Sequence, residues 1–271
     1  MPAPEARVMI MTFLLFLAVG AVAGLLAGLF GIGGGMVIVP VLVLTFAAQG
    51  ISEAVLTHMA VATSLATIVF TSISSVREHH KNGAVDWSLV AMMSVGIIVG
   101  TAIGVSLITS VPGPVLQKII GVFALLVAIK MFFGLDPKRD GSRPGNAGLV
   151  TAGGVVGFGS SWFGIGGGTF TVPYLTWMQI PMRQAVATSA ACGLPIALTG
   201  AISNVFAGWD QAGLPQWTTG FLYWPAIVGI VLTSVPCARV GARLAHKLDQ
   251  KLLKKAFALL LVVVGLRFLL S

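Results

Sequence analysis

Two glycine runs are the part of this 271-residue sequence best suited to binding a ligand. Each run reads Phe-Gly-Ile-Gly-Gly-Gly, at 30–35 and at 163–168, and each is followed by a Val-Pro pair. A glycine costs a helix about 1 kcal/mol relative to alanine, so we expect each run to break a helix, with new helices beginning at Met36 and Thr169. A helix N-terminus carries about half a positive charge and unpaired N–H groups, and therefore binds anions. The glycines expected to form this binding site are Gly31, Gly33, Gly34, Gly35, Gly164, Gly166, Gly167 and Gly168.

Close helix packing is the alternative explanation for glycines in such a sequence. It suits the glycines spaced four apart within 20–28 and 96–104, which have the small-xxx-small spacing of packed membrane helices. Packing alone does not require three adjacent glycines, so we favour ligand binding for the two runs. The runs also differ from the dinucleotide-binding pattern GxGxxG, because Met36 and Thr169 occupy the place of its last glycine.

Hydroxyl and basic side chains recur near both glycine runs. Ala-Thr-Ser occurs at 62–64 and at 187–189, with a basic residue five positions before each threonine. Hydroxyls and a cation suit an anion, although Thr and Ser also bond to the preceding helical turn and an arginine also snorkels to the membrane surface or fixes topology. His79 and Asn204 form a further pair, separated by 125 residues. They are weaker binding candidates because His79 stands in a charged segment typical of a cytoplasmic loop. The binding candidates are Thr63, Ser64, Thr188, Ser189, His58 and Arg183, followed by His79 and Asn204.

Acidic side chains are absent from the long apolar stretches. A buried carboxylate for binding a cation or relaying protons is therefore lacking, and no His/Cys/carboxylate cluster suits a metal. Cys192 and Cys237 are expected to be small core residues. Without a GxSxG or HExxH motif as well, the sequence predicts no metal, no cofactor and no enzymatic activity. The eight carboxylates lie at the termini or near segment ends: Glu5, Glu53, Glu78, Asp86, Asp136, Asp140, Asp210 and Asp249.

The composition places these residues in a membrane. Hydrophobic residues make up 56% of the chain and charged residues 9%, against about 25% charged residues in soluble domains. Uncharged intervals such as 8–52 and 87–117 exceed the roughly 20 residues of a membrane-spanning helix. We therefore expect an all-α polytopic membrane protein whose partners are the lipid bilayer and a small anionic substrate. The long apolar intervals exclude soluble enzymes and nucleic-acid binders. Basic cytoplasmic loops account for the net charge of +8.

Internal repetition divides the chain into two halves, 1–140 and 141–271, which form one integrated transmembrane domain. The glycine motifs match at an offset of 133 residues, the Ala-Thr-Ser motifs at 125, and the C-terminal segments of the halves at 137. The segment after each glycine run is short, which leaves open ten full crossings or eight crossings with two broken pairs. The first segment is expected to be a retained helix and not a signal peptide. The predicted segments are 8–30, 36–49, 56–76, 87–110 and 115–133, then 146–163, 169–180, 184–206, 217–238 and 250–270.

The basic clusters predict the orientation of these segments. Lysine, arginine and histidine concentrate at 77–81, 138–143 and 239–255, and all three clusters are consistently placed in the cytoplasm. The fourth segment then runs outward and its repeat partner, the ninth, runs inward. Inverted-topology repeats with helix breaks near the midplane are typical of transporters.

The combined motifs resemble the sulfite exporter TauE/SafE family, also called TSUP, over nearly the whole chain. They are the Phe-Gly-Ile-Gly-Gly-Gly…Val-Pro pair at 30–40 and 163–173, the Ala-Thr-Ser pair at 62–64 and 187–189, and the Thr-Ser-Ile-Ser-Ser…His stretch at 71–79. The resemblance implies a multi-pass protein of the bacterial cytoplasmic (inner) membrane. It also implies transport of small anions, such as sulfite, organosulfonates and related sulfur or carboxylate compounds.

The leading hypothesis is therefore an anion permease in which one half rocks against the other to alternate access. An anion channel with the same site and a non-transporting component of a membrane assembly are the alternatives. The lack of a membrane carboxylate leaves His58 or the substrate gradient to drive transport. The sequence leaves the oligomeric state open, with a homodimer as one option.

Overall fold

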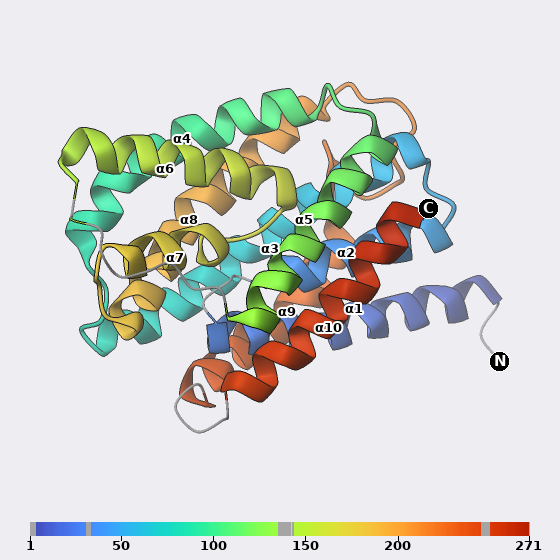
Figure 1. Ribbon diagram of the computed structural model, residues 1–271. Helices are drawn as coiled ribbons and strands as arrows, with labels where there is room; N and C mark the ends of the chain where they lie inside the picture. The colour runs from blue at the N-terminus through green and yellow to red at the C-terminus, as the bar shows by residue number, and fades with distance from the viewer. Residues whose placement is uncertain (1–3, 31–33, 135–141, 143, 245–249, 271) are drawn as a thin grey trace.

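The computed structural model describes residues 4–30, 34–134, 142, 144–244 and 250–270. In these ranges the chain forms ten helices and one two-stranded hairpin (Figure 1). The elements are α1 (Pro4–Phe30), α2 (Gly35–Ala48), α3 (Glu53–Lys81), α4 (Trp87–Ile108), α5 (Gly113–Phe133), α6 (Asn146–Phe163), α7 (Gly168–Trp177), α8 (Met182–Ala207), β1 (Thr218–Thr219), β2 (Leu222–Tyr223), α9 (Trp224–Leu244) and α10 (Gln250–Leu270). The predicted all-α polytopic membrane class is confirmed.

Helix length separates the membrane-spanning helices from the two that follow the glycine runs. Six helices (α1, α3, α4, α5, α8 and α9) are long and apolar enough to cross a membrane. Helices α2 and α7 have 14 and 10 residues, or about 21 and 15 Å at 1.5 Å per residue. Both are shorter than the roughly 30 Å hydrocarbon core of a bilayer. They therefore suit the broken-pair alternative, while the number of full crossings stays a prediction.

Two segment boundaries differ from the sequence prediction. Residues 217–223, expected to open the ninth segment, form the hairpin β1–β2, in which Thr218 pairs with Tyr223. Trp217 and Gly220 adopt φ values of 66° and 54°, which a helix cannot accommodate. The third and ninth segments continue as helix to Lys81 and Leu244. His79 and Arg239 consequently lie on helices and not in the loops that we predicted.

Glycines bring two helix pairs into backbone contact. On α1, a Cβ at Gly20 or Gly24 would overlap the backbone of α9 at Ile230 or Ser234. The 96–104 glycines of α4 pack in the same way against α6, which runs beside it in Figure 1. Small residues permit this close approach of membrane helices, so the packing interpretation of these glycines is confirmed.

Each helix contact has an equivalent contact in which the two halves change roles. Helix α1 packs against α9 as α6 packs against α4, while α3 contacts α8 and α5 contacts α10. Gly193 of α8 lies near Ser72 and Gly200 near Leu65, so the equivalent helices α3 and α8 run in opposite directions, as inverted repeats predict. These contacts interlock the two halves. The division at residue 140 itself stays a prediction.

Two ends of the helix bundle are used below as reference points. The basic end is where α3 finishes at Lys81, α8 begins at Met182 and α9 finishes at Leu244. The hairpin end carries β1–β2 and the beginning of α3. The most deeply buried of the candidate spans are α3 and α8, and they connect the two ends through the centre of the molecule.

Candidate functional site

The two glycine breaks meet in the interior of the bundle. A Cβ added at Gly35 would overlap the carbonyl oxygen of Gly164 and lie 2.8 Å from the Cα of Ile165. The Gly164 carbonyl accepts a 2.7 Å hydrogen bond from the buried Oγ of Ser64. Gly34 and Gly164 both have left-handed φ values, 76° and 59°, which glycine adopts without steric cost. The other predicted glycines of the first run, Gly31 and Gly33, lie outside the described residues.

The helices after the breaks begin one residue earlier than predicted. Helix α2 begins at Gly35 and α7 at Gly168, and neither N-terminus is capped by a side chain. The first N–H groups of a helix lack partners within the helix. The beginning of α7 therefore offers N–H donors beside Gly166 and Gly167, next to a cavity.

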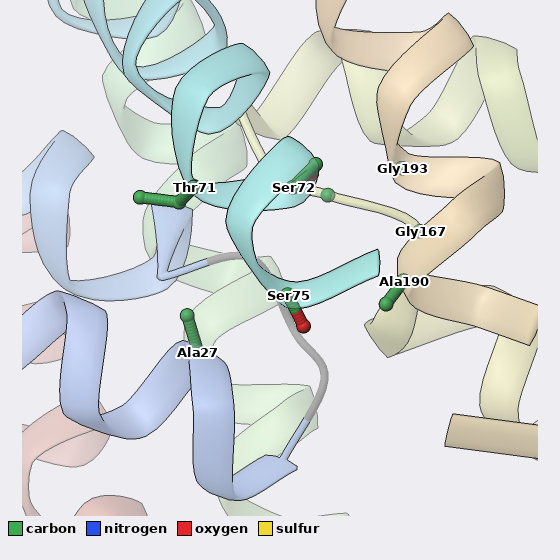
Figure 2. A pocket seen from close by; sticks show the side chains of 8 residues that line it. Ala27, Thr71, Ser72, Ser75, Gly167, Ala190 and Gly193 are labelled. Carbon is green, nitrogen blue, oxygen red and sulfur yellow. The ribbon is translucent and has the colours of Figure 1, made fainter. Parts of the chain in front are cut away.

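The cavity lies between α3, α8, the end of α1 and the second glycine break. Figure 2 shows Thr71, Ser72 and Ser75 on α3 between Ala27 of α1 and the α8 residues Ala190 and Gly193. Gly166 and Gly167 complete the lining. Its volume is about 10 Å³, close to the minimum for a single water molecule. The described lining contains three hydroxyl side chains, glycine backbone and the methyl groups of Ala27 and Ala190, but no carboxylate.

Glycines keep this small cavity open. A Cβ at Gly193 would lie 3.3 Å from the Oγ of Ser72 and 3.4 Å from the backbone nitrogen of Gly167. A Cβ at Gly167 would lie 2.9 Å from the carbonyl oxygen of Ser189. A larger side chain at either position would therefore fill the space or push the break away from α8.

The hydroxyls at the cavity differ in their hydrogen bonding. Thr71 Oγ1 lies 3.2 Å from the carbonyl oxygen of Ile68, to which it donates within α3. Ser75 is buried, and its Oγ has no hydrogen-bond partner among the described residues. An unpaired buried hydroxyl is costly. The Ser75 hydroxyl is thus available to a bound ligand.

The predicted threonines make equivalent backbone contacts in the two halves. Thr63 Oγ1 accepts a 3.1 Å hydrogen bond from the N–H of Tyr223, just before α9. Thr188 Oγ1 accepts a 3.0 Å hydrogen bond from the N–H of Asp86, just before α4. Tyr223 and Asp86 are repeat partners at the offset of 137 residues. Both threonines hold the beginning of a helix from the other half, and their role in a path for substrate stays a prediction.

The predicted serines lie beside the breaks. Ser64 binds the Gly164 carbonyl, as described above, and is fully buried. Ser189 is also fully buried, but its Oγ has no hydrogen-bond partner among the described residues. The repeat partner of Gly164, which Ser64 binds in the other half, is Gly31. Gly31 lies outside the described residues.

The structure separates the two basic candidates. His58 is buried near the hairpin end, with Nε2 3.1 Å from the carbonyl oxygen of Ile108 and its ring stacked on Phe221 at 5.5 Å. Arg183 is exposed in the first turn of α8, at the basic end. Neither residue lines the cavity.

The last predicted pair is also separated. Asn204 is buried, and its Nδ2 donates a 2.8 Å hydrogen bond to the carbonyl of Gly200. The backbone carbonyl of Asn204 accepts a hydrogen bond from the N–H of Phe221, so Asn204 supports the hairpin. His79 lies near the C-terminus of α3, partly exposed. Neither His79 nor Asn204 lines the cavity.

The cavity brings together residues that the sequence analysis did not select. Thr71, Ser72 and Ser75 belong to the stretch that carried the family resemblance, but we gave them no role. Their spacing of one, three and four residues places the three hydroxyls on one side of a helix. That periodicity was the available signal. For Gly193 the sequence offered none, since it becomes important only through its contact with α3.

Metal binding has no support in the described part of the chain. No three His, Cys, Asp or Glu side chains come together there. Cys192 is buried and Cys237 partly buried, and both are free thiols.

Comparisons with known proteins agree with this architecture. The sequence profile described as Sulfite exporter TauE/SafE matches residues 16–268. A "probable membrane transporter protein" of Haemophilus influenzae is 38% identical, covering 95% of this chain and 98% of its own length. Relatives with the same description occur in Methanocaldococcus jannaschii, at 28% identity over 94% of this chain and 95% of the relative, and in Escherichia coli (YfcA), at 27% over 93% and 87%. No solved structure matches the chain.

Proposed function

The chain belongs to the sulfite exporter TauE/SafE family of multi-pass membrane transport proteins, and we propose that it is a permease for small anions such as sulfite or organosulfonates. The observation that carries this proposal is the cavity between α3, α8 and the second break. Its described lining combines hydroxyls, glycine backbone and two alanine methyl groups, and it includes no acidic side chain. We place the protein in the inner membrane of a bacterium, with the basic end in the cytoplasm.

The chemistry of the cavity favours an anion over a cation. The N-terminus of α7 contributes N–H donors and the positive end of its helix dipole. Ser75 adds a hydroxyl without a partner in the described structure. Sulfite and sulfonates present several acceptor oxygens, and hydrogen bonds to charged acceptors are stronger than those to neutral ones. A cation would be favoured by an acidic side chain, and the described lining contains none.

The cavity must widen before it can hold the substrate. Space for about one water molecule is too small for sulfite. The substrate therefore enters only when the second break moves away from Gly193 and Ser72. The interlocked pairs α1–α9 and α4–α6 join the two halves, so we propose moving bodies that contain helices from both halves. This replaces the simple rocking of one half against the other.

A substitution that fills the cavity tests the proposal. In proteoliposomes, Gly193→Val should abolish uptake of radiolabelled sulfite, because its methyl groups would occupy the space beside Ser72 and Gly167. Gly145→Ala is the matched control, since a Cβ there meets no atom within 4 Å. Both variants should insert and purify as the parent protein does. Normal sulfite and organosulfonate uptake by a correctly inserted Gly193→Val protein would overturn the proposed site.

A further inference from the structure

Arg239 is an exposed, charged side chain near the end of a candidate membrane span, and it binds the α3 residue next to Ser75 of the cavity. It lies in the span Trp224–Gly241 of α9. Its Nε donates a 3.1 Å hydrogen bond to the Oγ of Ser74. Ser74 in turn donates a 3.2 Å hydrogen bond to the carbonyl of Val235, one turn earlier on α9. This network fixes the arginine against α3 at the residue next to Ser75 of the cavity.

The charge of Arg239 is not neutralised by a described carboxylate. Glu78 lies one turn beyond Ser74 on α3, yet no ion pair joins it to Arg239. An arginine near the end of a membrane helix commonly extends to the membrane surface, whereas the bond to Ser74 holds the Arg239 side chain against α3. The bond to Ser74 uses the Nε donor, and the remaining guanidinium donors have no partner among the described residues.

The repeat relation shows that this arrangement occurs in one half only. At the offset of 137 residues Arg239 corresponds to Ala102, and at 125 residues Ser74 corresponds to Thr199. The cation is therefore absent from the equivalent position between α4 and α8. It belongs to the side of the molecule that has the hydroxyl-lined cavity, on the part of α3 that leads to the basic end.

We infer that Arg239 is the cationic residue that binds the substrate anion at the basic-end mouth of the cavity, with Ser74 holding its guanidinium in position. This inference rests on the proposed function and gives its site the positive side chain that neither His58 nor Arg183 supplies. The anion would bind to the free guanidinium donors before it passes to the hydroxyls of Ser75 and Ser72. Arginine suits this task because its planar donors match oxyanions in a bidentate manner.

Charge substitutions on α9 test the inference. Arg239→Gln should raise the KM for sulfite about tenfold, as expected for a lost hydrogen bond to a charged group, and leave the maximal rate within about twofold. Arg239→Lys should recover part of the affinity, because lysine keeps the positive charge but lacks the planar pair of donors that binds an oxyanion in a bidentate manner. Arg243→Gln is the matched control, since Arg243 is exposed like Arg239 and lies one turn further along the same helix, beyond the residue that binds Ser74. At the same sulfite concentration, the melting temperature should rise less in Arg239→Gln than in the parent protein and the control.

The outcomes separate this inference from the proposed function. If Gly193→Val abolishes uptake while Arg239→Gln keeps the parental KM and the sulfite-induced thermal shift, Arg239 does not bind the anion and the cavity proposal stands. If Gly193→Val transports normally, the cavity proposal fails. Should Arg239→Gln not fold, Ser74→Ala is used, because it keeps the charge and frees the side chain. A raised KM in Ser74→Ala supports the inference, and an unchanged one overturns it.

Discussion

Helices α3 and α8 occupy equivalent places in the two halves, yet they present different surfaces beside the breaks. On α3, Thr71, Ser72 and Ser75 line the cavity. Their repeat partners on α8, at an offset of 125 residues, are Ile196, Ala197 and Gly200. The facing residues also differ, because Ala190 and Gly193 correspond to Leu65 and Ile68. One side carries three hydroxyls beside a small cavity, and the equivalent side chains of the other side are apolar or absent.

On α8, apolar side chains pack closely at the described positions where α3 carries its hydroxyls. A Cβ at Gly200 would lie 2.7 Å from Cδ1 of Leu65, a fully buried side chain. Ile68 and Ile196 are fully buried as well. Among the described residues, α3 and α8 are therefore equivalent in position but differ in the polarity of these side chains. We had expected a common site between two equivalent helix ends, but Gly35 and Gly164 touch there, and the described cavity adjoins the second break.

Removing the serine hydroxyls of α3 should have the largest effect on sulfite uptake. The double variant Ser72→Ala/Ser75→Ala gives α3 the apolar character of Ala197 and Gly200. We expect sulfite uptake, expressed as kcat/KM in proteoliposomes, to fall about 100-fold, since each hydrogen bond to a charged ligand contributes roughly 1.5 kcal/mol or more. Ala197→Ser, the reciprocal change on α8, is the control and should leave uptake close to that of the parent. Equal loss in both variants would mean that the two sides do not differ in function.

Removing the apolar filling tests the other side. Leu65→Ala should lower the free energy of unfolding by about 2 kcal/mol or more, because a buried leucine leaves a cavity, and uptake per folded molecule should change little. Thermal unfolding in detergent measures the stability. Leu126→Ala is the control, because Leu126 is exposed on α5. A large loss of uptake with unchanged stability in Leu65→Ala would place the transport path on the apolar side.

The sequence predicted the scaffold better than the site. Apolar segments and the glycine spacing follow from local composition, so the helices and the close packing of the glycines at 20–28 and 96–104 agree with expectation, while their partner helices were not predicted. The hairpin was missed because residues 217–223 are apolar enough to resemble the beginning of a helix. The cavity was missed because it depends on Gly193 and Ser72, which lie far apart in sequence and meet only through antiparallel packing. The repeat relation pairs His58 with Arg183, and the structure places them at opposite ends of the bundle, as inverted repeats do with equivalent residues. Their role in binding stays a prediction.

The threonine contacts test how far the two sides are truly equivalent. Thr63→Val and Thr188→Val should each lower the free energy of unfolding by about 1 kcal/mol, because each leaves a backbone N–H without its acceptor. The two losses should be similar, as the hydrogen bonds of 3.1 and 3.0 Å join equivalent residues. Thermal unfolding of both variants, with Thr199→Val as the control, measures this. A loss confined to one threonine would contradict the equivalence.

The smallest expected effect concerns the charge at the mouth of the polar side. Glu78 lies one turn beyond Ser74 on α3, and its repeat partner on α8 is the neutral Ser203. A carboxylate near the mouth repels an incoming anion, so Glu78→Gln should lower the KM for sulfite about twofold at low ionic strength and much less at high salt, where the charge is screened. Asp210→Asn, at the hairpin end, should have no such effect on uptake from the basic end. A higher KM in Glu78→Gln would instead mean that Glu78 orients Arg239, and the anion would then depend on a positioned pair of charges at this end.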